Sequence, residues 1–458
     1  MATTQLYHDA AAGNQKTWTF SAWIKKSNLG SNAYLFSQGS SGTNFIGIYF
    51  GTNDEFKVYN EVSSSQTLYF ITNRLLRDTS AWYHIVVQCD TTQATEADRF
   101  KIWINGSQET SFSTAAYPAQ NSDTNMNAAT RERIGVYHPG GSSPNHYWNG
   151  YMSHIALVDG SVVAPTVFGE TDSTSGIWKF KQPTGVTWGT NGFHLKFENS
   201  GNLGLDSSGN SNTFSLSGNG RQALDTPSNV YATMASPTWY DGTIANGGNT
   251  VNTNQTNYRY QTASIGVSKG KWYWEVKLTT TNDYIVMGIT DAPSPTNVGS
   301  DWIIGSGTYD YSVVYNTAGG NGDKYNNAGT SPTNTPGTFM GAFSEGDIIM
   351  FALDCDNNTL KIGTNNSWSN GTGSTNQTFA NTTAISITAP SSTNGGFYFP
   401  AVGDYSGGTS LLDLNFGNGY FGTTAITSAG SNGNGSLFEY DVPSGYYALN
   451  TKNINTYG

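Results

Sequence analysis

Short runs in which apolar and polar residues alternate recur along the whole chain and predict β-strands. The clearest run is GKWYWEVKL at residues 270–278, where Trp272 and Trp274 alternate with Tyr273 and Glu275. Side chains point alternately to the two faces of a strand, so the tryptophans share one face and the other two residues share the opposite face. The run therefore predicts a half-buried strand of a β-sandwich.

Further strand patterns follow this run. They are YIVMGIT (284–290), the hairpin pattern GDIIMFALDCDNNTLKI (346–362), FYFPAVG (397–403) and LLDLNFG (411–417). This order of motifs resembles the SPRY family over Ser228 to Gly458. The resemblance implies a bent β-sandwich that presents variable loops for binding, and it implies no shared catalytic residues.

A second set of strand patterns precedes the first. It comprises TWTFSAWIKK (17–26), WYHIVVQCD (82–90), RFKIWINGSQ (99–108), RIGVY (133–137) and YWNGYMSHIALVDGSVV (147–163). The Asn-Gly dipeptide in the third run favours the positive φ angles of a tight turn. The set resembles the laminin-G-like, concanavalin-type jelly roll over residues 14–198. This resemblance implies a β-sandwich in which the second and third runs are neighbours.

The two sets together predict an all-β protein of two consecutive antiparallel β-sandwiches. A turn-rich stretch, Thr190–Asn229, lies between them, so we expect a first domain at residues 1–217, with its connecting segment, and a second at 218–458. A chain of 458 residues is long enough for two or three domains. Charged residues make up 12% of the chain and aromatic residues 13%, which favours many short strands over a disordered chain.

The charge balance argues against several classes of partner. The formal net charge is −11 and no basic run occurs, whereas nucleic-acid binding needs clustered Lys and Arg. The chain has no long apolar stretch and no signal-type N-terminus, so we expect no membrane insertion. Cys89 and Cys355 fall in different predicted domains, and we expect buried free thiols rather than a disulfide.

The sequence predicts a binding protein rather than an enzyme. A retaining glycosidase needs two carboxyl groups about 5 Å apart, and the Glu-x-Asp-x-x-Glu pattern of glucan-cleaving jelly rolls is absent. Glu96 and Asp98 have a suitable spacing but lie in a polar turn. No nucleophile elbow, HExxH motif or recognised Cys-His spacing occurs.

Aromatic residues beside Asn, Asp and Gly are the candidate ligand contacts, because flat apolar rings and directional hydrogen bonds together suit sugars. The loop 137–148 of the first domain and the region 301–325 of the second have this composition. The alternative is that such rings belong to the core, as we expect of Trp148. The candidate contacts are Tyr137, His138, Asn145, Trp302, Tyr309 and Tyr325.

Calcium is the metal that the residue types favour, since Asp and Asn oxygens and backbone carbonyls are its usual ligands. Asp206 and Asn210, in the turn-rich stretch, are the candidate ligands. The run Asp354–Asn358 also carries suitable oxygens, but a hairpin turn whose side chains cap their own backbone explains it better. The sequence indicates no other cofactor.

Several loops, among them DTTQA (90–94) and FGETDSTSGIWKFK (168–181), are similar to laminin-G-like proteins encoded by marine bacteriophages. This resemblance implies a virion protein of tail-fibre or capsid-fibre type, made in the host cytoplasm. We expect it to attach to host-surface carbohydrate, to contact other virion proteins and to form a homo-oligomer within the particle. Two alternatives stay open: a purely architectural decoration or tail component, and a polysaccharide-degrading enzyme.

Overall fold

The structure of the chain, a computed structural model, has two compact units. Unit 1 runs to Gln222 and includes Thr226–Ser228, and unit 2 comprises Ala223–Asp225 and Asn229–Gly458. This division lies a few residues after the predicted boundary at 217/218. The structure describes residues 3–140, 143–234, 243–253, 259–281, 285–292, 304, 308–315, 323–326, 339–404 and 409–458.

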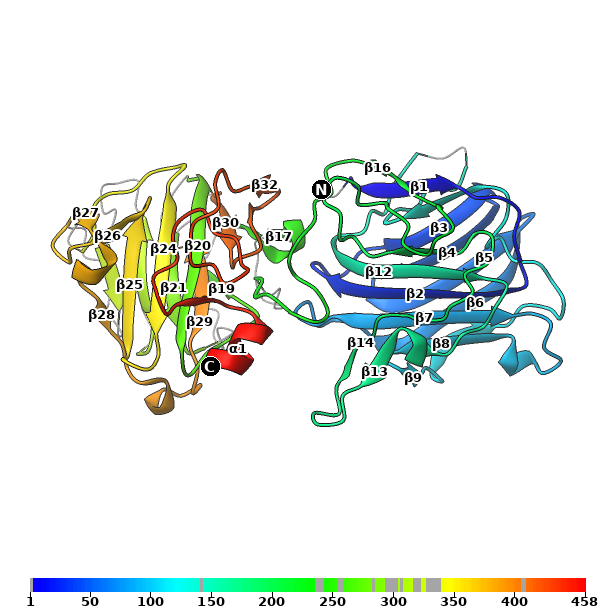
Figure 1. The fold of residues 1–458 in the computed structure, drawn as a ribbon, viewed down its shortest axis with the longest axis horizontal. Coiled ribbons are helices and arrows are strands. Elements are labelled where there is room, and N and C mark those ends of the chain that lie inside the picture. Colours follow the sequence, from blue (N-terminus) through cyan, green and yellow to red (C-terminus); the bar gives the residue numbers. More distant parts are fainter. Residues whose placement is uncertain are drawn as a thin grey trace. The chain divides into compact units, whose positions relative to one another are not determined.

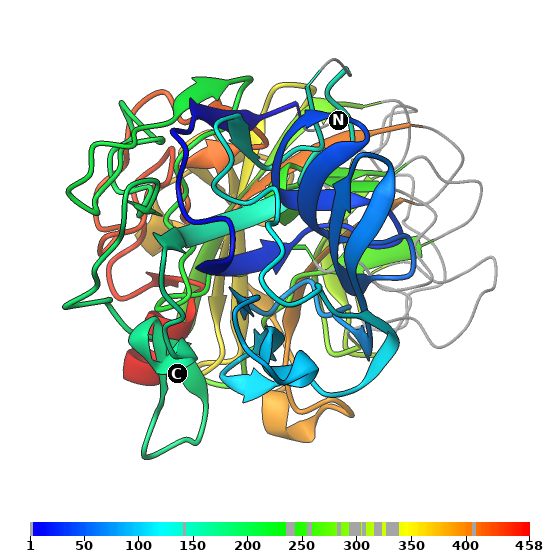
Figure 2. The same cartoon turned by 90° about the vertical axis from the view of Figure 1, so that its right-hand side faces the viewer.

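Unit 1 is a β-sandwich of two antiparallel sheets, as the alternating pattern predicts (Figure 1). The larger sheet has eight strands, and its blue strands lie side by side in Figure 2. In spatial order the strands are β10 (Phe112–Ala116), β6 (Ser65–Leu75), β5 (Glu55–Val62), β4 (Asn44–Phe50), β3 (Ala33–Ser41), β11 (Arg131–Ile134), β1 (Gln5–Asp9) and β16 (Ser215–Ser217).

The second sheet of unit 1 has six strands. The two runs predicted to be neighbours form its adjacent strands β7 and β8, with Val87 opposite Ile102. In spatial order the strands are β15 (Phe193–Leu195), β12 (Gly150–Asp159), β2 (Thr17–Lys26), β7 (Tyr83–Asp90), β8 (Phe100–Ile104) and β9 (Ser107–Gln108). Beside the sheets lie the 3-10 turns η1 (Glu96–Asp98) and η2 (Pro165–Val167) and the hairpin of β13 (Gly169–Thr171) and β14 (Trp178–Phe180).

The core of unit 1 lies between the inward faces of the two sheets. β4 sends Ile46, Ile48 and Phe50 inward, and β2 sends Trp18 and Phe20 inward; all five side chains are fully buried. Burying an apolar side chain of this size contributes about 1.5–3 kcal/mol. The alternation leaves every second residue of the eight-stranded sheet facing away from the core.

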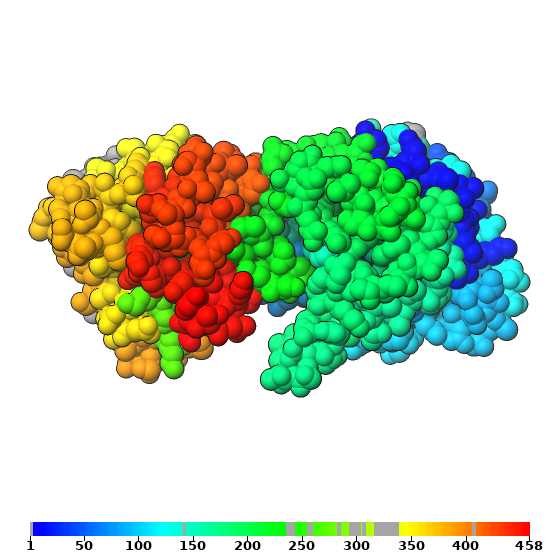
Figure 3. Space-filling model, viewed as in Figure 1, coloured from blue at the N-terminus to red at the C-terminus, as the bar shows by residue number. Residues whose placement is uncertain are grey.

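The outer face of the six-stranded sheet carries His84, which is buried, and His154, which is half-buried. Nε2 of His84 lies 2.9 Å from Oγ of Ser21, and Nδ1 of His84 accepts a hydrogen bond of 3.0 Å from Nε1 of Trp178. An indole N–H only donates, so Nδ1 carries no proton and the imidazole is neutral. His154 stacks on Phe180 with ring centroids 3.8 Å apart. These contacts hold the base of the β13–β14 hairpin, whose tip projects from the surface in Figure 3.

Unit 2 is a second β-sandwich, which confirms the all-β prediction. Its larger sheet contains β17 (Thr243–Ala245), β18 (Thr250–Asn252), β30 (Leu411–Asn415), β20 (Lys271–Thr280), β24 (Ile348–Asp354), β25 (Thr359–Thr364), β26 (Ser367–Ser369) and β27 (Thr375–Gln377), with β28 (Ile385–Ser386) on β25 and β33 (Tyr447–Ala448) parallel to β20. Its other sheet contains β19 (Arg259–Thr262), β29 (Phe399–Asp404), β21 (Ile285–Thr290), β22 (Tyr311–Tyr315) and β23 (Asp323–Asn326).

Short elements complete unit 2. They are η3 (Asn246–Gly248), η4 (Phe379–Asn381), η5 (Pro390–Ser392), the strand pair β31 (Tyr420–Phe421) and β32 (Thr424–Ala425), and the helix α1 (Thr451–Tyr457). Across the part of the chain that the structure describes, no helix is long and apolar enough to cross a membrane.

β20 is buried on both faces, whereas its alternation predicted a half-buried strand. Trp272 and Trp274 face the main core of unit 2. Tyr273 and Glu275 face the other way and are also fully buried. The reason is the C-terminal segment, which places apolar residues such as Phe438 over this second face of the sheet. The pattern of one strand does not show that a distant segment covers its polar side.

Glu275 fastens this C-terminal segment to the sheet. Its carboxylate accepts hydrogen bonds from the backbone N–H groups of Glu439 and Tyr440, at 3.0 Å each. It also accepts bonds from Oη of Tyr273 at 3.0 Å and from Nδ2 of Asn415 at 3.2 Å. Four donors around one buried carboxylate meet the requirement that a buried polar group be hydrogen-bonded.

Both cysteines are buried and free, as predicted. Burial raises the pKa of the Cys355 thiol to about 12, and it raises the pKa of the Cys89 thiol as well. The thiolate is the reactive form, so neither side chain is a nucleophile near neutral pH.

Replacing His84 by Gln is expected to make unit 1 less sensitive to acid. Burial lowers the pKa of His84 from 6.5 to about 3. Between these values the unfolded chain binds a proton that the folded chain does not, so this contribution to stability is full above pH 6.5 and is lost as the pH falls towards 3. Hydrogen exchange of β7 peptides in urea should show the stability advantage of the wild type over His84→Gln shrinking from pH 7 to pH 4.5. A constant advantage would contradict the prediction.

For Glu275→Gln in unit 2, the stability advantage of the wild type is expected to shrink as the pH rises, which is the opposite of the dependence expected for His84→Gln. Burial raises the pKa of Glu275 from 4.5 to about 7, against the effect of its four hydrogen-bond donors. The folded chain holds a proton that the unfolded chain releases between these values, so stability falls as the pH rises through them. In the variant, the side-chain NH₂ group of the introduced glutamine would face backbone N–H donors and leave them without an acceptor. This loss lowers the stability of the variant by about 1–3 kcal/mol at any pH. Hydrogen exchange of β20 peptides should show a larger wild-type advantage at pH 5 than at pH 8, and the reverse order would refute this.

Candidate functional site

The outward side of the eight-stranded sheet carries a cluster of aromatic rings, which we call the tyrosine face. It comprises Tyr34 on β3, Phe45 and Tyr49 on β4, Tyr59 on β5 and Tyr69 on β6. Each ring alternates with core residues of its own strand, so all five point away from the core. The register places Tyr34 opposite Tyr49 and Tyr59 opposite Tyr69.

The rings of the tyrosine face pack against one another across the strands. Tyr34 and Tyr49 are stacked, with centroids 4.4 Å apart and 3° between the planes. Tyr59 meets Tyr69 edge to face at 5.1 Å and lies 5.4 Å from Phe45. Such pairs contribute about 0.5–1.5 kcal/mol each beyond their burial. Tyr34 and Phe45 are buried by this packing, whereas Tyr49, Tyr59 and Tyr69 are half-buried and offer part of each ring to solvent.

Two glycines let the buried rings lie close to the sheet. A Cβ atom on Gly47 would lie 2.7 Å from Cε1 of Tyr34, and a Cβ atom on Gly39 would lie 2.5 Å from Cβ of Phe45. A larger residue at Gly47 would push the ring of Tyr34 away from the strand, whereas at Gly39 it would meet the backbone of the neighbouring strand at Asn44 and Phe45. The ring of Tyr34 therefore fills the space that Gly47 leaves, and the other rings pack beside it.

The loop after β11 forms a wall on the β3 side of the tyrosine face. Tyr137 and Asn145 are paired by two backbone N–H to O hydrogen bonds of 3.0 Å. The pairing holds the ring of Tyr137 at 4.9 Å from Tyr34 and 5.3 Å from Phe45. It also holds His146 nearly parallel to Tyr34 at 6.2 Å. The structure thus brings the predicted contact Tyr137 onto the tyrosine face.

The other two predicted contacts of this loop differ in exposure. Asn145 is exposed, and its Nδ2 donates to the backbone oxygen of Ser143 at 3.4 Å. His138 is half-buried, and its backbone N–H donates to Oγ of Ser37 at 3.4 Å. This last bond ties the loop to β3.

Three predicted contacts belong to unit 2. Trp302 lies outside the described residues. Tyr325 lies in β23, of which the structure describes the backbone alone. Tyr309 is half-buried and packs against the main core of unit 2. Ligand contact at these three positions stays a prediction.

The phenols of Tyr49 and Tyr59 are neutral hydrogen-bonding groups. Burial and the bond from its hydroxyl to Glu61 raise the pKa of Tyr59 to about 12, and burial raises the pKa of Tyr49 above its ordinary range. Oη of Tyr59 donates to Oε2 of Glu61 at 2.8 Å. On the same side of β5, Nζ of Lys57 lies 2.8 Å from Oε1 of Glu55. The face therefore combines apolar rings with hydroxyl donors and carboxylate acceptors.

The strand tyrosines were missed in the sequence, although a signal for them exists. In NFIGIYF (44–50) Phe45 and Tyr49 alternate with isoleucines, and in FKVYN (56–60) Tyr59 alternates with Val58. Even spacing places these rings on the side away from the core. The sequence does not show the register between strands, and it is the register that gathers rings from four strands into one surface.

The predicted calcium ligands use their side chains within their own turn. Oδ1 of Asp206 accepts from the backbone N–H groups of His194 and Ser208, and Oδ2 accepts from the Ser208 hydroxyl and the N–H of Asn212, all within 2.7–2.9 Å. The side-chain amide of Asn210 donates to two backbone carbonyls. Among the described residues, no group of three or more His, Cys, Asp and Glu is placed to hold a metal ion. Calcium at this turn stays a prediction.

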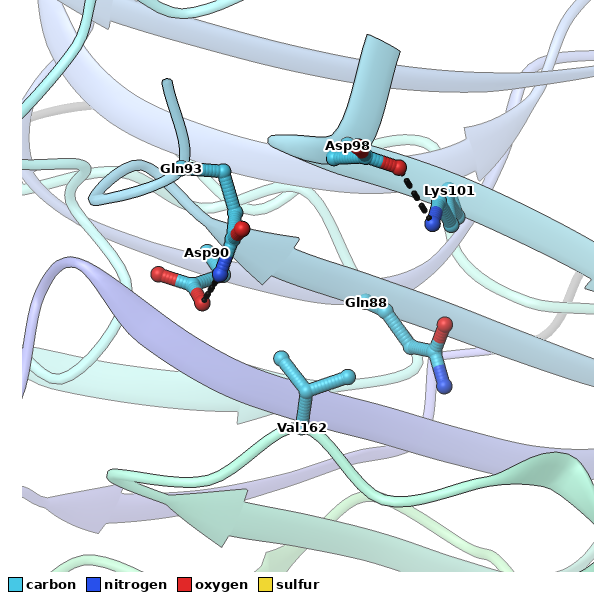
Figure 4. A pocket seen from close by; sticks show the side chains of 6 residues that line it. All are labelled: Gln88, Asp90, Gln93, Asp98, Lys101 and Val162. Carbon is cyan, nitrogen blue, oxygen red and sulfur yellow. Dashed lines mark hydrogen bonds and ion pairs between the residues drawn. The ribbon is translucent and has the colours of Figure 1, made fainter. Parts of the chain in front are cut away.

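A separate pocket of about 240 Å³ lies over β7 and β8 (Figure 4). Its carboxylates are engaged: Asp98 pairs with Lys101 at 2.9 Å, and Asp90 accepts from Nε2 of Gln93 at 2.6 Å. Glu96, the other acid of the predicted turn, is exposed on η1. Ligand pockets usually exceed about 300 Å³, so we favour the tyrosine face as the site. The pocket is lined by Gln88, Asp90, Gln93, Asp98, Lys101 and Val162.

Comparison with solved structures finds similar β-domains. The SPRY domain of human HERC1 is 18% identical, with 38% of this chain and 91% of that chain covered and a TM-score of 0.27. A heptameric SAP-like pentraxin from Limulus polyphemus is 14% identical, with coverages of 40% and 82% and a TM-score of 0.29. Domain 4 of AbnA, an extracellular arabinanase from Geobacillus stearothermophilus solved with arabinotriose, is 14% identical, with coverages of 35% and 66% and a TM-score of 0.25.

Comparison with protein families gives two matches, one in each unit. No curated protein matches the chain. Residues 2–168 match the concanavalin A-like lectin/glucanases superfamily, in its laminin-G-like model, and residues 271–401 match the SPRY domain. The laminin-G-like and SPRY resemblances seen in the sequence are confirmed, so the chain carries a laminin-G-like, concanavalin A-like domain followed by a SPRY domain. The resemblance to proteins of marine bacteriophages stays a prediction.

Proposed function

We propose that the protein is a lectin-like binding protein that holds carbohydrate on the tyrosine face. The observation that carries this proposal is the grouping of Tyr49, Tyr59 and Tyr69 on three adjacent strands, each half-buried with its ring fixed by its neighbours. Accessible apolar surface that is contiguous often marks a site of interaction. The match of this unit to a superfamily of lectins and glucanases supports the proposal.

The chemistry of the tyrosine face suits a sugar. A pyranose ring has apolar C–H faces that can stack on a phenol, and its hydroxyls can pair with polar groups around the ring. Tyr59 and Glu61 offer a hydroxyl and a carboxylate that lie 2.8 Å apart. Tyr34, packed over Gly47, stacks on the ring of the accessible Tyr49 and holds it in place. A platform fixed in advance loses little conformational entropy when a ligand binds.

We also propose that the protein is a structural or accessory component of a phage particle and uses this site to attach to host-surface glycans. Its loops resemble laminin-G-like proteins of marine bacteriophages, which supports this role. A single site of this kind binds near 1 mM, about −4 kcal/mol. Several copies on one particle raise the avidity by about 10²–10⁴. In this role the chain is a homo-oligomer in the virion, and its partners are other virion proteins and host carbohydrate.

A purely architectural role is the second candidate. Tyrosine is enriched at protein interfaces, and the same rings could dock another virion protein. A stable interface of this type would bury more than about 1,000 Å² and would cover the tyrosine face. A polysaccharide-degrading enzyme is the third candidate, and the hydrogen-bonded carboxylates of the pocket over β7 and β8 give it little support. We therefore propose a binder without catalytic activity.

Tyr59→Ala and Tyr69→Ala are each expected to weaken glycan binding about tenfold, because each removes a stacking ring of about 1 kcal/mol or more. A glycan array identifies the ligand of the intact chain, and calorimetry then compares the variants. Tyr59→Phe is the matched variant that keeps the ring and loses the hydroxyl bond to Glu61. Tyr457→Ala, on α1 of unit 2, is the control and should bind like the wild type. Equal affinity of all variants would exclude the tyrosine face as the site.

The virion assignment predicts that the chain is present in purified particles of the phage that encodes it. Cryo-electron microscopy of these particles should show many copies with the tyrosine face and loop 137–148 exposed at the particle surface. A chain that mass spectrometry fails to find in the particle would refute the assignment. A tyrosine face covered by another virion protein would favour the architectural role.

A further inference from the structure

The tyrosine face is closed on its β3 side. Ser37 is fully buried there: its Oγ donates to the backbone oxygen of Val136 at 2.8 Å and accepts from the N–H of His138 at 3.4 Å. Tyr137 packs against Tyr34, which is only 7% exposed. The loop therefore covers β3, and the row of accessible rings ends at this wall.

The opposite side of the tyrosine face leads to the edge of the sheet. Gly47, Tyr59 and Tyr69 lie opposite one another on β4, β5 and β6, and Ala116 on β10 continues the same line. β10 is the terminal strand of the eight-stranded sheet, and its residues are half-buried or exposed. A ligand that follows this line meets the small side chain of Ala116 and then passes the edge.

The length of this line sets the length of ligand that it can contact. Neighbouring strands are about 4.8 Å apart, so the three steps from β4 to β10 span roughly 14 Å, enough for about three pyranose rings in line. The first ring would lie against the wall. The following rings would lie over Tyr59 and Tyr69, in that order.

The charges on the tyrosine face favour an uncharged ligand. Lys57 is paired with Glu55 at 2.8 Å. Arg133, which follows Ser37 in the same cross-strand line, is only 6% exposed. Glu61 keeps its carboxylate beside Tyr59, and the whole chain has a net charge of −11. An acidic glycan would be repelled by this negative potential.

We propose that the tyrosine face binds the end of a neutral hexose chain. The terminal ring lies against the wall formed by Tyr137 and His146, and the next rings extend over Tyr59 and Tyr69 towards β10. A platform open on both sides would accept an internal segment of a chain, whereas the closed β3 side selects an end. This inference rests on the proposed carbohydrate binding. It adds that the ligand is a neutral hexose chain, that an end of the chain is bound, and that the chain runs from the wall towards β10.

The test uses calorimetry with linear malto-, cello- and laminari-oligosaccharides of one to six rings. The affinity for the series that binds should rise about tenfold for each added ring up to the third and then stay constant. An acidic series, the oligogalacturonates, should bind at least tenfold more weakly. Cyclodextrin is a malto-chain without ends and should bind much more weakly than linear maltoheptaose.

Three outcomes would overturn the inference. The first is cyclodextrin binding as tightly as the linear chain, which would show that an internal segment is bound. The second is an affinity that is equal for one ring and for six. The third is binding to none of the three neutral series. In each case the glycan array decides separately whether the protein binds carbohydrate, so the two proposals can fail independently.

Two variants locate the ends of the site. Tyr69→Ala should abolish the gain in affinity from the third ring, while the affinities for one and two rings stay unchanged. Tyr137→Ala should open the wall, so that affinity keeps rising beyond the third ring and cyclodextrin binding appears. Tyr457→Ala is again the control in unit 2, and circular dichroism of all variants checks that they are folded. Identical length profiles for Tyr69→Ala and the wild type would contradict the proposed direction.

Discussion

The two-residue period of the strands is the constraint on which the structure of unit 1 depends. A sheet in a sandwich packs one face against the core, so Ile46, Ile48 and Phe50 must point inward and Phe45 and Tyr49 must point outward. A shift of one residue in register would exchange the two sets. The same packing that buries the core therefore fixes the tyrosine face, and the site needs no separate folding element.

Glycine and the loop after β11 turn this outward side into a shaped surface. Without a side chain at Gly47, the ring of Tyr34 lies against the strand and stacks on the ring of Tyr49. The ladder pair of Tyr137 and Asn145 then closes one side of the surface. Rings held by these contacts keep their rotamers, so the face is organised before any ligand arrives.

The sequence predicted the fold more completely than the site. Alternation identified the two sandwiches and the inward position of Trp272 and Trp274, because burial against a core leaves a local pattern. The alternation placed Glu275 on the polar side of a half-buried strand, and this prediction was wrong. Glu275 is covered by residues more than 150 positions away in the sequence, such as Glu439 and Tyr440. Tyr137 was found as a loop aromatic.

The tyrosines of β3 to β6 were missed for a related reason. Each of them is an ordinary outward residue of its own strand, and they form a surface only through the pairing of four strands. Local composition carries little information about such pairing. The same limit applies to Glu275, whose partners come from the C-terminal segment.

The sheet faces that point away from the cores differ in how far other segments of the chain cover them. In unit 2 the C-terminal segment covers the outer side of β20 and is fastened there by the buried Glu275. In unit 1 the hairpin β13–β14 packs on the histidines of the six-stranded sheet. Tyr49, Tyr59 and Tyr69 of the eight-stranded sheet stay half-exposed instead. The packing of these rings against one another stabilises the sheet, and the part of each ring that stays accessible is free to contact a ligand. The accessible sides of these rings are the surface on which the proposed carbohydrate binding depends.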